Sequence, residues 1–342
     1  MVTPAGVSTG NHGVLALGLL DNIGLRTPRW YRAWRTKNPD VYDPQVQWEK
    51  AVSEVTESPC PMAVISSEFF IGFGRGPRAK QCIDTVHAFL EPFDVRIVCY
   101  LRRPDNMIES FYNQVIKTGD AVQRLYGDVS RYRDKPVLDY VRALSPWVDR
   151  FGREHVIVRN YDRLIDGDLV ADFFSIIGKS EASALGGIEG TRNPRIPNAL
   201  VELKRFCNVL QNSPRQEQQI NHALSILADS VDLVPDRLVS TLSENDRRFL
   251  YQHTMDLNER LQSLLGDAAE QPFFEDPDSI LKSEGEAVTD LQAAERYAGL
   301  LSLLITVQAY DGPPASSKAT HSPNERQSKE ILVEKDQYWG LS

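Results

Sequence analysis

The sequence has few of the features that mark several large classes of protein. Its 342 residues include four cysteines, without a CxxC pair or the Cys/His spacing of a metal site: Cys60, Cys82, Cys99 and Cys207. We therefore expect reduced, mostly buried thiols, and neither a disulfide framework nor a metal centre. Basic residues do not predominate, since the net charge is −9 and the pI is near 5.3. This balance argues against a nucleic-acid partner bound by general phosphate neutralisation.

Long apolar runs are also missing. The longest, YAGLLSLLITVQAY at 297–310, is too short to span a bilayer comfortably, so it predicts a core-facing helix and no transmembrane segment. The first residues show no basic stretch followed by an apolar core, as a secretory signal would. These absences favour a cytoplasmic location.

The composition that remains is ordinary, at 42% hydrophobic and 25% charged residues, enough for one large domain or two smaller ones. Up to about residue 180, short apolar runs alternate with helical patterns, which predicts an α/β fold with a parallel sheet. The predicted strands are 62–66, 95–101 and 155–160, and the predicted helices between them are 79–91, 104–118 and 136–150. Further helices are predicted at 197–212, 215–230, 243–265 and 287–308.

One segment is more informative about ligand binding than the rest of the chain: VRIVCYLRRPDNMIESFYNQVIKTG at 95–119. Its β-type run ends in two arginines, and Pro104 is placed to open a helix that carries Ser110, eight residues after Arg102. Arg102 is then expected at the carboxyl end of a strand and Ser110 about two turns into the helix. A guanidinium and a hydroxyl at that edge suit a bound phosphate. Strand alternation cannot turn both Arg102 and Arg103 to the same side, and we favour Arg102.

This segment resembles the 3′-phosphate-binding segment of sulfotransferases that use 3′-phosphoadenosine 5′-phosphosulfate (PAPS). Arg102 and Ser110 match the Arg and Ser of that family in spacing, and YLRRPDNMIESFYNQVIKTG is similar to bacterial members that sulfate carbohydrates. Three more stretches resemble the family in the same order: AVISSEFF at 63–70, WVDRFGREHVIVRNYDRL at 147–164 and DLVADFFSIIG at 168–178. The resemblance covers roughly residues 9–210.

The chain departs from the family at its start. Members normally begin with a strand, a Gly-rich loop containing Lys and Ser/Thr, and a helix, and this loop holds the 5′-phosphosulfate. Here the chain opens with MVTPAGVSTGNHGVLALGLL, similar to the stretch that follows that unit. A βα unit of roughly 30 residues is therefore expected to be missing, as in a truncated or degenerate member.

The resemblance implies a P-loop-like parallel sheet flanked by helices, with a helical C-terminal part. We expect an N-terminally incomplete α/β domain at 1–190, a helical part packed on it at 191–310, and a disordered tail at 311–342, where the sequence is polar and rich in breakers.

Two residues are candidates for the base that takes the acceptor's proton. His12 lies in TGNHG at the entrance to an apolar helix, and its pKa near neutrality suits proton abstraction. Glu68 follows Ser66 and Ser67 after a predicted strand. Each has a plain structural alternative, because His12 can flank its helix and Ser-Ser-Glu is common helix-start chemistry.

Segment 191–198, TRNPRIPN, resembles the family's late loop near the nucleotide, which makes Arg192 and Asn193 candidate cofactor contacts. The same residue types are also ordinary linker chemistry.

The function implied by the resemblance is transfer of a sulfuryl group from PAPS to a hydroxyl or amine acceptor, with a carbohydrate as the expected partner. No metal is required. One alternative keeps the fold without the chemistry, as a noncatalytic remnant that binds nucleotide or takes part in assembly. A second is a P-loop-type kinase, although GxxxxGK[ST] and an acidic Mg²⁺ ligand pattern are both absent from the sequence. Activity, acceptor and oligomeric state stay open.

A further patch places arginines at every third position from Arg26 to Arg35, interleaved with Trp30, Tyr31 and Trp34. Such a patch suits an acidic ligand, but a solvated helical face whose tryptophans pack inward is the preferred interpretation.

Overall fold

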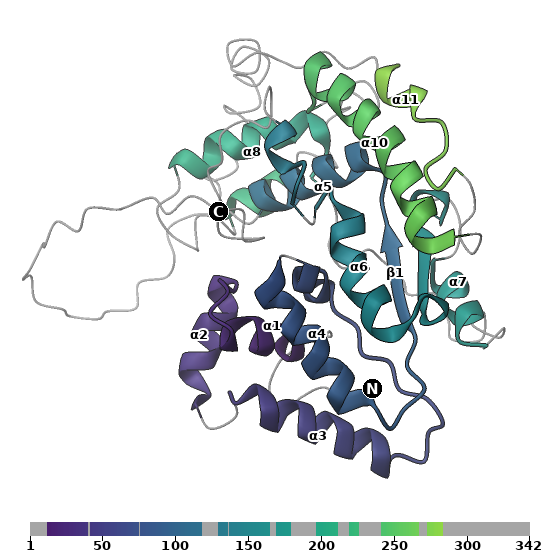
Figure 1. Cartoon of the computed structure of the whole chain (residues 1–342). Helices are drawn as coiled ribbons and strands as arrows, with labels where there is room; N and C mark the ends of the chain where they lie inside the picture. The colour runs from purple at the N-terminus through teal and green to yellow at the C-terminus, as the bar shows by residue number, and fades with distance from the viewer. Residues whose placement is uncertain are drawn as a thin grey trace, which may run out of the picture.

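The computed structural model describes residues 12–39, 42–74, 76–117, 129–135, 137–164, 169–178, 196–210, 219–225, 241–266 and 272–282. These residues are mostly helical, with one small parallel sheet (Figure 1). The chain is therefore of the α/β type, as predicted, with far more helix than strand.

Four helices precede the sheet and lie together in the lower part of Figure 1: α1 Gly13–Asn22, α2 Arg29–Lys37, α3 Pro44–Glu57 and α4 Pro77–Leu90. Eight of the ten residues of α1 are buried, in keeping with a helix that is apolar on all sides. The indole of Trp48 on α3 donates a hydrogen bond to the carbonyl of Leu15 at 3.2 Å. The start of α3 is capped by the Asp43 carboxylate, which accepts from the amide of Gln45 at 2.8 Å.

The sheet pairs β1 Ile97–Leu101 with β2 Val156–Asn160 in parallel, with Leu101 opposite Asn160. Between the strands run α5 Pro104–Lys117, a short turn of helix η3 Val129–Tyr132, and α6 Tyr140–Phe151. The strand predictions for 95–101 and 155–160 and the helix predictions for 104–118 and 136–150 are confirmed, with shifts of a few residues at the ends.

The predicted strand at 62–66 is wrong. These residues form no regular secondary structure, and Met62 and Val64 are each 45% exposed. Among the described residues, the backbone groups of 62–65 have no hydrogen-bonding partner. An apolar run with the right composition becomes a strand only when a neighbouring strand satisfies its backbone. No strand lies there in the part of the chain that the structure describes.

A short 3₁₀ segment, η2 Glu68–Gly74, links 62–66 to α4 and packs against α6. A Cβ placed on Gly74 would lie 2.3 Å from the Cα of Ala143. Glycine is therefore required for this close approach of the two backbones.

The later helices are α7 Leu169–Ile176, α8 Asn198–Leu210, α10 Glu244–Leu265 and α11 Asp278–Leu281, with a helical segment at 219–225. The helical predictions for 197–212 and 243–265 are confirmed. The predicted helix at 287–308 and the predicted tail at 311–342 lie outside the described residues. The domain boundaries stay predictions.

Two hydrophobic cores share the long helix α10. The first lies around α5 and α8 and includes Leu250, and the second lies around α1, α4, the sheet and α6 and includes Leu257 and Leu261. Figure 1 shows α10 extending from the neighbourhood of α5 toward the sheet. A capping box of Ser243 and Asp246 fixes its start.

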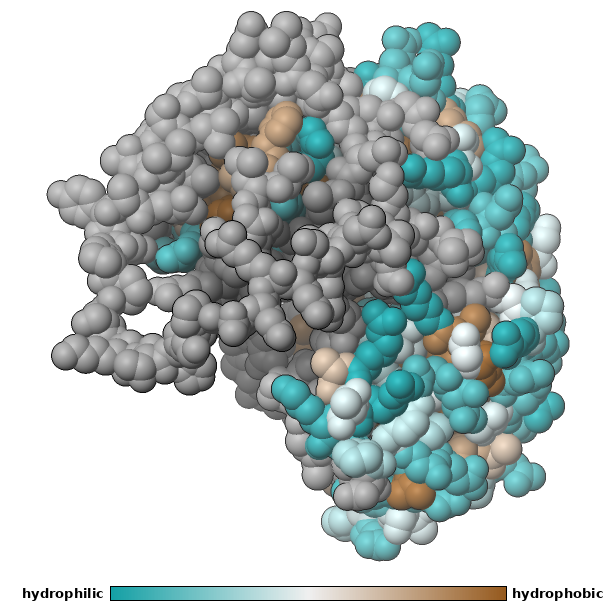
Figure 2. Space-filling view, turned by 90° about the vertical axis from the view of Figure 1, so that its left-hand side faces the viewer, coloured by the Kyte–Doolittle hydropathy of each residue, from teal (hydrophilic) through white to brown (hydrophobic). Residues whose placement is uncertain are grey.

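On the face shown in Figure 2, the described residues present mostly hydrophilic side chains with scattered hydrophobic ones. No helix in the described part of the chain is both long and apolar enough to cross a membrane.

Candidate functional site

The carboxyl ends of β1 and β2 bring together two residues that are far apart in the chain. Arg102 follows β1 and Tyr161 follows β2, and the amide of Tyr161 donates to the carbonyl of Leu101 at 2.8 Å. The Arg102 guanidinium lies over the Tyr161 ring, with its Cζ 4.1 Å from the ring centroid. This distance is well within the range of a cation–π contact.

Arg102 is half-buried. Its backbone carbonyl accepts a hydrogen bond from the buried Tyr140 hydroxyl at 2.9 Å. Among the described residues, its guanidinium has no carboxylate partner and no hydrogen bond, so the Tyr161 ring is the contact that holds it. A cation–π contact uses no hydrogen-bond acceptor, so among the described residues no acceptor competes with a ligand for the N–H donors of Arg102.

Arg103 lies in a different environment. Its Nε and Nη2 donate to the two carboxylate oxygens of Asp105 at 2.7 and 2.9 Å. Its Nη1 donates to the Ser279 hydroxyl at 2.7 Å and to the Asp276 carbonyl at 3.2 Å. Burial lowers the pKa of Arg103, but the hydrogen bonds with Asp105 and the surrounding carboxylates outweigh burial and raise it overall. Arg103 ties the start of α5 to α11 and the residues just before it.

Asp162 fixes the first turn of α5. One carboxylate oxygen accepts from the backbone amide of Arg103, and the other accepts from the side-chain amide of Asn106 at 2.9 Å. The Asp162 amide in turn donates to the side chain of Asn160 at 2.9 Å. A carboxylate at a helix N-terminus satisfies free amides and complements the helix dipole. The turn after β2 therefore holds both the Arg102 side chain and the helix that carries Ser110.

Ser110 lies on α5 and is half-buried. It is about 9 Å from Pro104 along the helix axis, at a rise of about 1.5 Å per residue. In the described part of the chain its hydroxyl has no hydrogen-bonding partner. The described contacts thus leave the side-chain donors of both Arg102 and Ser110 unused.

Arg192 and Asn193 lie outside the described residues. Ile196 is described, and it is fixed to α5 by Asn113, whose side chain donates to the Ile196 carbonyl at 2.6 Å and accepts from its amide at 3.2 Å. Asn113 is three residues beyond Ser110 on the same helix. The entry to α8 is therefore attached one turn away from Ser110.

His12 precedes α1 and is bonded to Ser66. The His12 amide donates to the Ser66 carbonyl at 2.8 Å, and the Ser66 amide donates to Nδ1 of His12 at 3.1 Å. Because Nδ1 accepts a hydrogen bond, a neutral His12 carries its proton on Nε2. This arrangement suits a hydrogen-bond donor better than a base at Nε2.

Glu68 is exposed and opens η2, two residues after Ser66. The Ser67 hydroxyl accepts from the amide of Phe69 at 3.2 Å, as at a helix start. The two candidate bases are thus attached to one short segment, while Arg102 and Ser110 belong to the β1–α5 unit.

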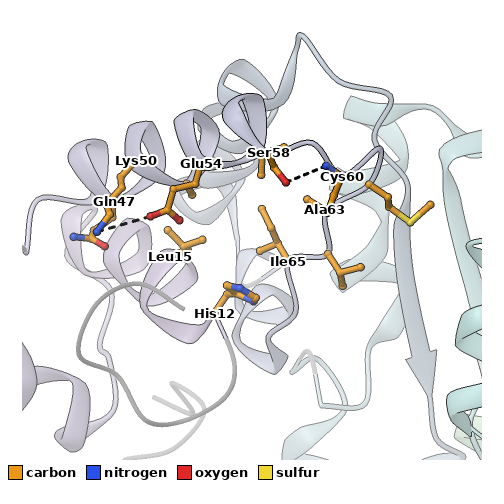
Figure 3. Close-up of a pocket in the computed structure, with 13 residues that line it drawn as sticks. His12, Leu15, Gln47, Lys50, Glu54, Ser58, Cys60, Ala63 and Ile65 are labelled. Atoms are coloured by element: carbon orange, nitrogen blue, oxygen red, sulfur yellow. Dashed lines mark hydrogen bonds and ion pairs between the residues drawn. The ribbon is translucent and has the colours of Figure 1, made fainter. Parts of the chain in front are cut away.

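A cavity of about 300 Å³ lies between α1, α3 and the segment 58–65. Figure 3 shows α3 on one side, the segment carrying Cys60, Ala63 and Ile65 on the other, and His12 at the edge. The ion pair between Lys50 and Glu54, at 3.9 Å, lies on the α3 side. The rest of the cavity lining is mainly apolar: Leu15, Ala51, Val55, Met62, Val64 and Ile65. The cavity suits a small amphipathic ligand.

All four cysteines are free thiols: Cys82 and Cys207 are buried, Cys99 is half-buried and Cys60 is exposed. Cys82 is buried, and burial raises the pKa of its thiol to about 12. Tyr31 is fully buried, and Arg35 forms an ion pair with Asp21. Among the described residues, no group of three or more His, Cys, Asp or Glu side chains is arranged to hold a metal ion.

Comparison with known proteins gives one partial match. A protein from Archaeoglobus fulgidus, described as an uncharacterized protein, is 32% identical over 117 residues. The match covers 34% of this chain and 30% of the length of that relative. No family model and no solved structure matches the chain. These comparisons do not place the chain in a family.

Tyr161 and Asp162 were not singled out from the sequence. The signal was present, because NYDRL belongs to a stretch that resembles the family, but their contacts with Arg102 and Arg103 depend on the pairing of two distant strands.

Proposed function

We propose that this chain is a sulfotransferase-like protein that binds PAPS, with Arg102 and Ser110 holding the 3′-phosphate. The observation that carries the proposal is the Arg102 guanidinium, stacked on Tyr161 and without a carboxylate partner among the described residues. It stands at the carboxyl edge of a parallel pair of strands, the usual place for ligands in α/β sheets. The proposal extends the observed two-stranded sheet to a P-loop-like fold.

The proposed reaction moves a sulfuryl group from PAPS to a hydroxyl or amine, with a carbohydrate as the expected acceptor. The bond between sulfur and the phosphate oxygen breaks, a bond from sulfur to the acceptor oxygen or nitrogen forms, and 3′-phosphoadenosine 5′-phosphate is released. The acceptor's proton passes to a base. Glu68 is the better base candidate of the two, because the Ser66 amide bonds to Nδ1 of His12. His12 then serves as a hydrogen-bond donor on the acceptor side.

A second candidate keeps nucleotide binding but replaces catalysis with assembly. It is favoured by the segment 62–65, in which Met62, Ala63 and Val64 are exposed. Within the described residues the backbone groups of this segment are unpaired, which suits strand addition by another polypeptide. The two candidates share the Arg102 site and differ in turnover.

The test is calorimetric titration of the chain with 3′-phosphoadenosine 5′-phosphate. We expect saturable binding that Arg102→Ala weakens about tenfold to a hundredfold and that Ser110→Ala also weakens. Arg96→Ala is the matched control, because Arg96 is exposed and precedes the opposite end of β1. Circular dichroism establishes that each variant is folded.

A folded wild-type chain that does not bind would overturn both candidates. Where binding is present, incubation with PAPS and a panel of carbohydrate acceptors separates them. Release of 3′-phosphoadenosine 5′-phosphate that depends on acceptor supports the enzyme, and binding without turnover supports the assembly protein.

A further inference from the structure

We infer that Tyr161 is a positioning residue whose ring holds the Arg102 guanidinium in the orientation that receives a phosphate. The inference rests on the proposed function, because it assigns a role within the same site. It concerns a residue that would act through Arg102, with no required contact to the ligand.

The first support is the origin of the two side chains. They leave the sheet from adjacent parallel strands at matched positions, since Leu101 pairs with Asn160 and the Tyr161 amide donates to the Leu101 carbonyl at 2.8 Å. The ring therefore reaches the guanidinium from a backbone that the sheet itself holds in register. The contact between Arg102 and Tyr161, at 4.1 Å, therefore depends on the parallel pairing of β1 with β2.

The second support is the rigidity of the turn that carries the ring. Asn160, just before Tyr161, donates from its side chain to the Phe273 carbonyl at 2.7 Å. Asp162, just after it, is bonded to the first turn of α5. Tyr161 thus lies between two anchored neighbours, which fix the backbone that carries its ring.

The third support is chemical. A carboxylate would hold an arginine through the same N–H donors that bind a phosphate, as Asp105 does for Arg103. An aromatic face holds the guanidinium through its π surface and leaves those donors free. Among the described residues, the Tyr161 hydroxyl has no hydrogen bond, so the ring alone explains the contact.

The test compares two nucleotides and three proteins. Binding of 3′-phosphoadenosine 5′-phosphate and of adenosine 5′-phosphate, which lacks the 3′-phosphate, is measured calorimetrically for the wild type, Tyr161→Phe and Tyr161→Leu. We expect Tyr161→Phe to stay within about twofold of the wild type, because the ring remains. We expect Tyr161→Leu to weaken binding of the first nucleotide about fivefold to tenfold while leaving the second unchanged.

A double variant sharpens the assignment. If Tyr161 acts through Arg102, then Tyr161→Leu has no further effect on affinity in an Arg102→Ala background. Equal losses for both nucleotides, a further loss in the double variant, or unchanged affinity in Tyr161→Leu would each overturn the positioning role.

A measurement without nucleotide keeps the inference separate from the proposed function. The side-chain NMR signals of Arg102 should show a ring-current shift in the wild type and in Tyr161→Phe, and should lose it in Tyr161→Leu. A wild type that shows no such shift overturns the inference, whether or not nucleotide binds. A wild type that shows the shift but binds no nucleotide overturns the proposed function, and the phosphate role of Tyr161 with it.

Discussion

Arg102 and Arg103 are adjacent in the chain, but they face different surroundings at the end of β1. The donors of Arg103 are used by Asp105, Ser279 and the Asp276 carbonyl. Arg102 has an aromatic ring against its face and, among the described residues, no partner for its donors. Successive side chains of extended backbone point to opposite sides, which separates the two arginines. The difference shows that the partners of an arginine, more than its place in a motif, decide whether it supports the fold or is available to a ligand.

The largest expected effect falls on stability at Arg103. Arg103→Ala should lower the free energy of unfolding by about 2–4 kcal/mol, because it leaves the partly buried Asp105 carboxylate without its partner. Arg102→Ala should lower it by less than about 1 kcal/mol, since a single cation–π contact is lost. Urea unfolding of the two variants beside the wild type measures both changes. Similar losses would contradict the division between the two arginines.

The ligand affinities should show the reverse order. Arg102→Ala should weaken binding of 3′-phosphoadenosine 5′-phosphate about tenfold to a hundredfold, because hydrogen bonds between two charged groups are lost. Arg103→Ala should stay within about threefold at a temperature where it is fully folded. Calorimetry below the unfolding transition measures both. A greater loss in Arg103→Ala than in Arg102→Ala would show that Arg103, and not Arg102, binds the phosphate.

Asp162 follows Tyr161 in the chain and accepts a hydrogen bond from the amide of Arg103, so it links the contacts of the two arginines. Its loss should have a moderate effect on stability. Asp162→Ala removes the acceptor from the first turn of α5 and should lower the free energy of unfolding by about 1–2 kcal/mol. Asp94→Ala is the control, since Asp94 is exposed in the turn before β1, and it should change stability by less than about 0.5 kcal/mol. Thermal unfolding of both variants checks this. Equal effects would mean that Asp162 does not cap the helix in solution.

The smallest expected effect comes from a change that keeps the charge. Arg102→Lys should weaken nucleotide binding about threefold to tenfold, because an ammonium lacks the flat face and the paired donors of a guanidinium. Affinity equal to the wild type would show that charge alone is needed. The stacking on Tyr161 would then have no role in binding.

Several elements could be predicted from the sequence because local signals determine them. The β-branched runs around Val98 and Ile157 gave both strands of the sheet, and Pro104 marked the start of α5. Strand alternation predicted that Arg102 and Arg103 do not face the same side, and the two residues do have different partners. The choice of Arg102 as the ligand residue rests on its spacing to Ser110 and stays a prediction. In the arginine-rich patch, Trp34 is partly buried against the core and Tyr31 is buried, while the side chain of Trp30 lies outside the described residues, so the inward packing of the tryptophans stays a prediction.

Other features depend on contacts between distant segments. The apolar run at 62–66 has strand composition, but no sequence signal shows whether a neighbouring strand will satisfy its backbone. The contact of Tyr161 with Arg102 depends on strand register, and the bond from Ser66 to His12 depends on how α1 meets the segment before η2. Sequence reasoning therefore found the residue types of the candidate site but not the residues that hold them in place.

The pairing of β1 with β2 also makes formation of the candidate site depend on folding of the sheet. Arg102 and Tyr161 meet only after the whole connection through α5 and α6 has closed, a non-local event that costs chain entropy. In a chain whose strands have separated, the two side chains are independent. Phosphate affinity at this edge would then report how much of the population has its sheet formed, and a tightly bound nucleotide would oppose strand separation by mass action.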